Sequence, residues 1–99
     1  LKILQSRVPN IREDLSVAIV HFVKELRKIE LFKQPGIAET IDWAQAMVEL
    51  NYITIDPEVL ESTIGALLKN QDDIRKLKES EAAKILTIIQ TEISLINRK

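Results

Sequence analysis

The 99-residue chain contains no cysteine, one histidine, two glycines and three prolines. The lack of cysteine excludes disulfide bonds, thiolate zinc sites and catalysis by a thiol. With a single histidine, His21, and no glycine-rich phosphate loop, the usual sets of residues for nucleophilic or metal catalysis cannot be assembled. We therefore expect no catalytic residue and no metal site in this chain. Few glycines and prolines also indicate few connections between elements.

The chain also has no large excess of charge of either sign, because it has 14 basic and 15 acidic residues and a net charge of −1. Small nucleic-acid-binding proteins neutralise backbone phosphates with an excess of Lys and Arg, and a pI near 5.9 shows no such excess. We therefore expect no binding to nucleic acid. No apolar run approaches the roughly 20 residues that span a bilayer, and no signal peptide is recognisable. We expect a cytoplasmic protein that does not contact membranes. Because the chain begins at Leu1 and its only methionine is Met47, we also expect it to be part of a longer protein.

The composition that remains is that of one small globular domain. Apolar residues make up 45% of the chain and charged residues 29%. This balance is too apolar for a disordered segment, and a chain of this length typically forms one domain. We therefore treat residues 1–99 as a single unit that is stabilised by packing alone.

Apolar residues at helical spacing predict the first long helix, from Asn10 to about Leu31. Asn10 is a suitable cap for its first turn, and Glu13 lies three residues later, as in a capping box. The residues that form the apolar face are Leu15, Ile19, Phe22, Leu26 and Ile29.

Two further helices follow recognisable start signals. Pro35-Gly36 predicts a tight connection, and after it the apolar spacing predicts a helix from Ile37 to about Asn51. Trp43 falls at helical spacing with Met47, so we expect it in the core. Asp56-Pro57-Glu58 combines a capping side chain, a proline at the first position and an acid in the first turn, which predicts a helix ending near Asn70.

The remaining residues also read as helix. Residues 71–97 fit either one long helix with a charged first half or two helices, the second capped by Ser80. Leu1, Ile3 and Leu4 are consistent with the last turn of an N-terminal helix. The fold class is therefore all-α, a small bundle of four to five helices. The apolar positions of the last segment are Ala82, Ile85, Leu86, Ile89, Ile93 and Ile96.

Several polar residues have both a functional and a structural interpretation. His21 lies off the main apolar face of its helix, which favours a solvated or contact-making side chain over a catalytic one. The pair Asp72-Asp73 fits a solvated helix surface better than a site, because consecutive helical residues point about 100° apart. Glu39, Thr40 and Asp42 lie at the start of the second long helix, where free amides attract anions. The residues alone favour the structural interpretation, in which Glu39 and Asp42 complement the helix dipole.

Three stretches taken together resemble the C-terminal lid of MoxR-type AAA+ ATPases, over about residues 1–74. The segment Glu-Thr-Ile-Asp-Trp-Ala is the most specific part of this similarity. The tail from residue 71 to residue 99 is similar only loosely. The stretches are Arg7-Val8-Pro9 with Glu13-Asp14-Leu15, Phe22-Val23 and Leu26-Arg27; Ile37 to Ala44; and Asp56-Pro57-Glu58-Val59 with Leu67-Leu68-Lys69 and Asp72-Asp73-Ile74.

This resemblance implies a helical lid that follows an α/β nucleotide-binding core in the full-length protein. The core would hold the Walker motifs and the arginine finger, and ATP and Mg²⁺ would bind there, with none bound to the isolated 99 residues. The lid would close over ATP and pack on neighbouring subunits of a ring, usually a hexamer. Such proteins act in chaperone-like remodelling and in cofactor or metal insertion, often with a von Willebrand factor A domain partner. The residues placed near the nucleotide are Ala38, Glu39, Thr40 and Trp43.

One departure from the family pattern concerns the γ-phosphate. Lids of this superfamily commonly place a sensor-2 arginine at the start of the helix that begins here near Ile37, yet no arginine lies between Arg27 and Arg75. We therefore expect nucleotide contact through the backbone and the turn from Glu39 to Trp43. The alternative function is a free-standing helical adaptor without nucleotide chemistry, which would bind a partner helix in a groove beside Trp43 and Met47.

Overall fold

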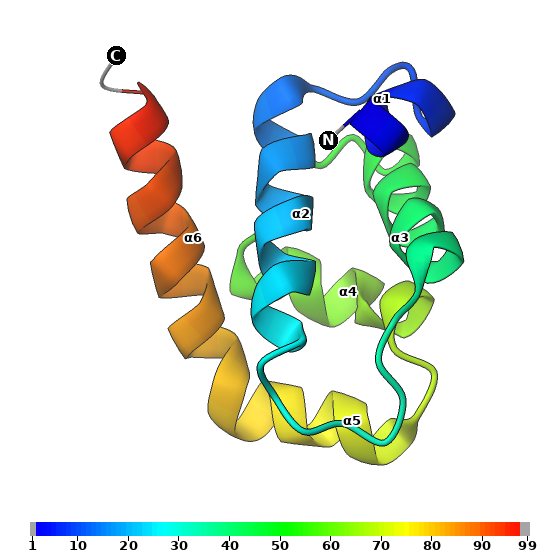
Figure 1. Cartoon of the computed structure of the whole chain (residues 1–99), viewed down its shortest axis with the longest axis vertical. Coiled ribbons are helices and arrows are strands. Elements are labelled where there is room, and N and C mark those ends of the chain that lie inside the picture. The colour runs from blue at the N-terminus through cyan, green and yellow to red at the C-terminus, as the bar shows by residue number, and fades with distance from the viewer. Residues whose placement is uncertain (1, 98–99) are drawn as a thin grey trace.

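A computed structural model describes the backbone of residues 2–97 and the side chains of residues 4–79 and 81–91. The described backbone is all-helical and contains no strand, which confirms the predicted fold class (Figure 1). The α-helices are α1 (Lys2–Arg7), α2 (Glu13–Leu26), α3 (Ile37–Glu49), α4 (Pro57–Leu67), α5 (Gln71–Lys76) and α6 (Ala82–Asn97). A π-helical turn, η1 (Leu77–Glu81), joins the last two.

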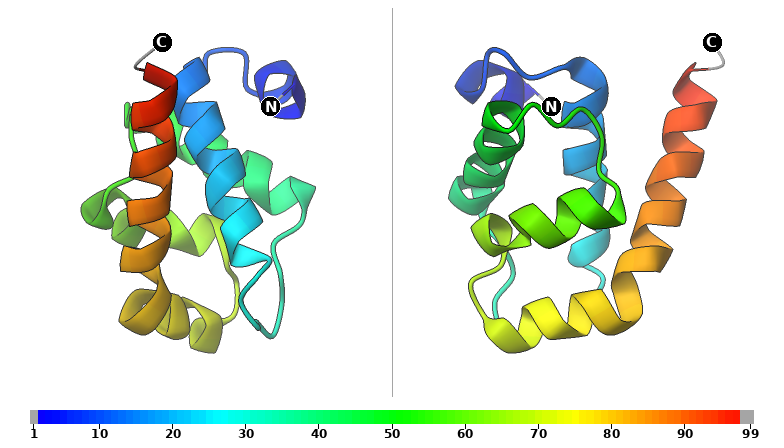
Figure 2. Two further views of the ribbon diagram at one scale, coloured as in Figure 1. Left: turned by 60° about the vertical axis from the view of Figure 1, so that its left-hand side comes forward. Right: turned by 180° about the vertical axis from the view of Figure 1, so that it is seen from behind.

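The helices enclose one core. In Figure 1, α2 and α3 run alongside each other, α4 lies crosswise behind them, and α5 closes the lower end. Helix α3 packs mainly on α4, and α6 packs along α2 (Figure 2). The molecule measures 36 × 26 × 22 Å. None of the described helices is long and apolar enough to cross a membrane.

Trp43 lies at the centre of this core. Its side chain is 0% exposed, and its ring centroid is 5.1 Å from that of Phe22, which is also fully buried. The indole Nε1 donates a hydrogen bond to Thr63 Oγ1 at 2.8 Å, so the polar edge of the ring is satisfied without solvent. Thr63 in turn donates to the carbonyl of Val59 at 2.7 Å. The prediction that Trp43 is a core residue is confirmed.

The prediction for the start of α2 was wrong. Asn10 does not cap the helix, because Pro9 and Asn10 form a turn in which the Ile11 amide donates to the Val8 carbonyl at 3.0 Å. Proline and asparagine are favoured at the central positions of such turns, and this preference prevails over capping. The helix starts at Glu13 instead.

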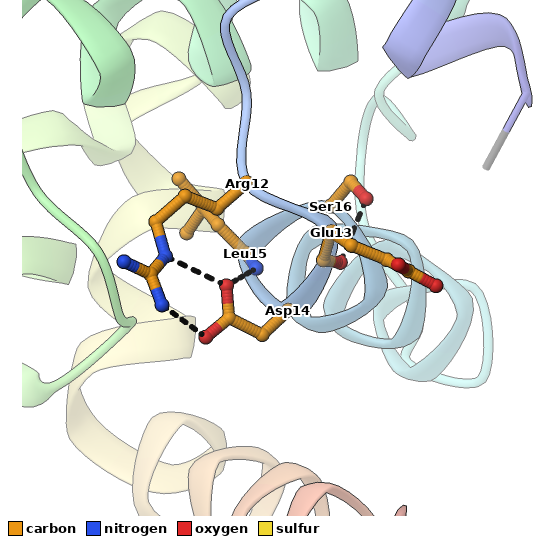
Figure 3. A network of polar contacts seen from close by, with 5 residues as sticks. All are labelled: Arg12, Glu13, Asp14, Leu15 and Ser16. Carbon is orange, nitrogen blue, oxygen red and sulfur yellow. Dashed lines mark hydrogen bonds and ion pairs between the residues drawn. The ribbon is translucent and has the colours of Figure 1, made fainter.

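Asp14 organises the first turn of α2 (Figure 3). Its Oδ1 accepts hydrogen bonds from Arg12 Nε at 3.1 Å and from the Leu15 amide at 2.9 Å. The hydrogen bond from Arg12 is the main reason why the pKa of Asp14 lies below its usual value. Ser16 Oγ donates to the Glu13 carbonyl at 2.8 Å.

The end of α2 also differs from the prediction, since the helix stops at Leu26 and not near Leu31. Gln34 Nε2 donates to the carbonyls of Leu26 and Ile29 at 3.1 and 2.8 Å. The Gln34 side chain therefore donates to the Leu26 carbonyl, which would accept a backbone amide if the helix continued. Residues 27–36 form a connection.

The starts of α3 and α4 agree with the sequence signals. Asp56 accepts a hydrogen bond from the Val59 amide at 2.9 Å, and Pro57 is the first residue of α4. Helix α4 ends at Leu67, a few residues earlier than expected. Asn70 caps α5 instead, because its Oδ1 accepts from the amides of Asp72 and Asp73 at 2.9 and 3.1 Å.

Residues 71–97 follow a continuous helical path that includes a π-helical turn, so neither expected alternative is complete. The backbone of Ser80 lies inside η1 and not at the start of a separate helix. Leu77 is buried at the beginning of this turn. The side chains of Ile93 and Ile96 lie outside the described residues, as does Leu1. The buried apolar residues of α6 are Ile85, Leu86 and Ile89.

Candidate functional site

The candidate site is the first turn of α3, where two side chains turn back onto Gly36. The Gly36 amide donates to Glu39 Oε1 at 2.8 Å, and Thr40 Oγ1 donates to the Gly36 carbonyl at 2.8 Å. Glu39 thereby satisfies an amide at the start of the helix. A methyl group in place of a Gly36 hydrogen would lie 2.9 Å from Glu39 Oε1, so the end of the Glu39 side chain would have to shift. Ala38 is exposed beside them.

The charged form of the Glu39 carboxyl is stabilised mainly by backbone amides and less by two lysines. The hydrogen bond from the Gly36 amide is the largest cause that lowers the pKa of the Glu39 carboxyl, and the backbone amide of Glu39 itself is the next. The charges of Lys33 and Lys69 lower it further. These lysines come from two different connections, and Lys69 Nζ also lies 3.3 Å from the Gly65 carbonyl.

Trp43 is not part of this surface. Ala38, Glu39 and Thr40 share the exposed or half-exposed first turn, whereas Trp43 is fully buried one turn later. The expected groove beside Trp43 and Met47 does not exist, because both side chains are 0% exposed.

An apolar groove of about 330 Å³ lies elsewhere, between α1, α2 and the first turn of α3. Sequence analysis missed it because its residues come from three helices, and no single periodicity contains them. Ile37, at its edge, is 61% exposed. The groove is lined by Leu4, Val20, Val23, Lys24, Arg27, Ile37, Thr40 and Ile41.

The prediction that Asp72 and Asp73 both lie on a solvated surface was wrong for Asp73. Only Asp72 is exposed. Asp73 is 2% exposed, and its two carboxylate oxygens accept from the amides of Phe32 and Lys33 at 2.8 and 3.0 Å. Lys76 Nζ adds a hydrogen bond to the Glu30 carbonyl at 2.7 Å. Helix α5 therefore holds the 27–36 connection and positions the backbone of Lys33 near the candidate site.

Within the described residues, no three His, Asp or Glu side chains gather in a way that could hold a metal ion. His21 is half-buried on α2 and takes part in an interaction of its own. Comparison of the chain with family models, with curated proteins and with solved structures found no match. Its function is therefore inferred from the residues and the geometry described above.

Proposed function

We propose that this chain is the C-terminal helical lid of a MoxR-type AAA+ ATPase, which helps to close over ATP in the full-length protein. The all-helical bundle is consistent with such a lid. The resemblance over residues 1–74 supports the family, and its most specific segment lies in α3. In this role the lid couples ATP hydrolysis in a ring, such as a hexamer, to chaperone-like remodelling or to insertion of a cofactor or metal.

The observation that carries the proposal is the charge arrangement at the first turn of α3. Lys33 and Lys69 act on Glu39 there, although no arginine occupies this turn. Two ammonium groups stabilise a phosphate group by the same Coulomb attraction that a sensor-2 arginine would supply. The Glu39 carboxylate is held by the Gly36 amide, which offsets part of its repulsion of a phosphate.

The core packing explains how a lid of this kind transmits motion. Trp43 joins α3 to α4 through Thr63, and α5 holds the 27–36 connection through Asp73. Nucleotide contact at the first turn of α3 would therefore move the whole bundle as one body. The ATP-hydrolysing residues, ATP and Mg²⁺ belong to the nucleotide-binding core, and the partners of the lid are that core, the neighbouring ring subunits and a von Willebrand factor A domain protein.

The first test uses these 99 residues alone. A lid supplies only part of a nucleotide pocket, so we expect no ATP hydrolysis and no binding measurable by calorimetry. The second test reads the gene upstream of Leu1, where we expect a phosphate-binding loop in the same reading frame. Micromolar ATP affinity for the 99 residues, or a start codon directly upstream, would contradict the proposal.

A third test uses the full-length ATPase. Replacing Lys33 and Lys69 together by alanine should raise the KM for ATP at least about tenfold, since the loss of even one charge-assisted contact of about 1.5 kcal/mol corresponds to a factor of about ten. The matched control replaces Lys78 and Lys84, which are exposed on η1 and α6, and should leave KM unchanged. Equal KM values for both double variants would remove the two lysines from the nucleotide site.

A further inference from the structure

The apolar groove beside α3 has a charge opposite to that of the chain as a whole. The chain has a net charge of −1, yet the groove is lined by two cations, Lys24 and Arg27, and by no carboxylate. Arg27 Nη2 lies 3.5 Å from the Pro35 carbonyl, which is a weak contact. In the part of the chain that the structure describes, neither cation forms an ion pair with a carboxylate. The groove therefore attracts an apolar group that carries negative charge beside it.

This groove adjoins the candidate nucleotide surface, and Thr40 belongs to both. Ile37 and Ile41 line the groove, whereas Glu39 does not. Successive residues of a helix are rotated by about 100°, so Ile37 and Glu39 project from nearly opposite sides of α3. A molecule in the groove and a nucleotide at Glu39 would contact different faces of the same turn.

We propose that the groove binds an amphipathic helix of a partner protein, with its aliphatic side chains in the groove and its Asp or Glu side chains on Lys24 and Arg27. An apolar groove between helices receives another helix through side chains spaced three and four residues apart. The described residues offer no strand edge to which an extended peptide could add. The half-buried Val20 and Ile41 and the more exposed Ile37 provide the apolar contact. This inference does not depend on the proposed lid function.

The test uses the 99-residue protein and a synthetic amphipathic helix built only from Leu, Ala and Glu. NMR titration should shift the resonances of Val20, Ile37 and Ile41 and give a saturable affinity. A matched peptide with Lys in place of every Glu should bind at least about tenfold more weakly, because like charges are then placed together. Equal affinity of the two peptides, or no shifts at these residues, would overturn the proposal.

Variants of the protein separate charge from apolar contact. Replacing Lys24 and Arg27 together by Glu should weaken binding of the acidic peptide at least about tenfold and strengthen binding of the basic one. The control double variant, Lys78→Glu with Lys84→Glu, changes the net charge equally and should bind the acidic peptide as the parent does. Ile37→Ser should weaken both peptides, and its fold is little affected because this side chain is largely exposed.

Two further outcomes would also overturn the proposal. If ATP shifts the same resonances and displaces the acidic peptide, the groove is a nucleotide site. If dilution converts a dimer to a monomer and shifts the NMR resonances of Val20 and Ile41, the occupant is a second copy of this chain. Thermal unfolding of each variant, followed by circular dichroism, shows that lost binding is not lost folding.

Discussion

The interior face of α3 and the connection that precedes it are held in different ways. On the interior face, Trp43, Ala44 and Met47 are fully buried among apolar side chains. In the connection, residues 27–36, polar side chains hold the backbone: Gln34 donates hydrogen bonds to carbonyls, and Asp73 accepts them from amides. Apolar burial is non-directional and follows helical periodicity, whereas each polar contact depends on one atom in one place. The two regions should therefore respond differently to substitution.

Trp43→Ala should have the largest effect. Removal of a fully buried indole costs about 3–5 kcal/mol, a large part of the stability of so small a domain. We expect loss of cooperative unfolding in urea, followed by circular dichroism. Gln45→Ala is the control, because Gln45 is exposed on the same helix. A variant at residue 43 that melts near the parent temperature would place Trp43 outside the energetic core.

Asp73→Asn should have an intermediate and local effect. An asparagine retains one oxygen acceptor and presents an NH2 group to the second amide, so we expect a loss of about 1–3 kcal/mol. Hydrogen exchange should accelerate at the amides of Phe32 and Lys33 while the amides of α4 stay protected. Asp72→Asn is the control, since Asp72 is exposed. Similar exchange in both variants would show that the 27–36 connection does not depend on the buried carboxylate.

Glu39→Gln should have the smallest effect on stability, and the size of that effect should depend on pH. The folded-state pKa of Glu39 lies below its ordinary value of 4.5, so its charged form stabilises the fold above that pH. This stabilisation is lost as the pH falls from near 4.5 through the lowered folded-state pKa. The stability difference between parent and variant, measured by thermal unfolding, should therefore shrink on acidification.

Glu61→Gln serves as the control for this measurement, because Glu61 is exposed on α4 and forms no comparable helix cap. A Glu39→Gln difference that stays constant from neutral to acidic pH would contradict a role for the charge. It would leave only the hydrogen bond to the Gly36 amide, which glutamine also accepts.

Much of the fold could be predicted because it depends on local signals. Asp56 and Pro57 mark the start of α4, and the spacing of Trp43 and Met47 identifies the buried face of α3. The turn of α3 that holds Ala38, Glu39 and Thr40 was also located, since Pro35-Gly36 precedes it.

Several features that escaped prediction depend on partners outside their own helix. Asp73 reads as a surface residue beside Asp72, and only the folded chain brings it to the amides of Phe32 and Lys33, some 40 residues earlier. Gln34 carries no sign that it ends α2. The meeting of Lys33 and Lys69 near Glu39 is likewise a product of tertiary structure.

The π-helical turn between α5 and α6 decides where this segment tolerates a change of length. A π-helix closes its hydrogen bonds over one more residue than an α-helix does, so η1 holds one extra residue within its turn. Deleting a single residue from η1 would restore regular α-helix and leave the register of α6 nearly unchanged. Ile85, Leu86 and Ile89 would then stay on the side of α2. A deletion within α6 before Ile85 has no such turn to absorb it and would rotate the residues after it by about 100° about the helix axis.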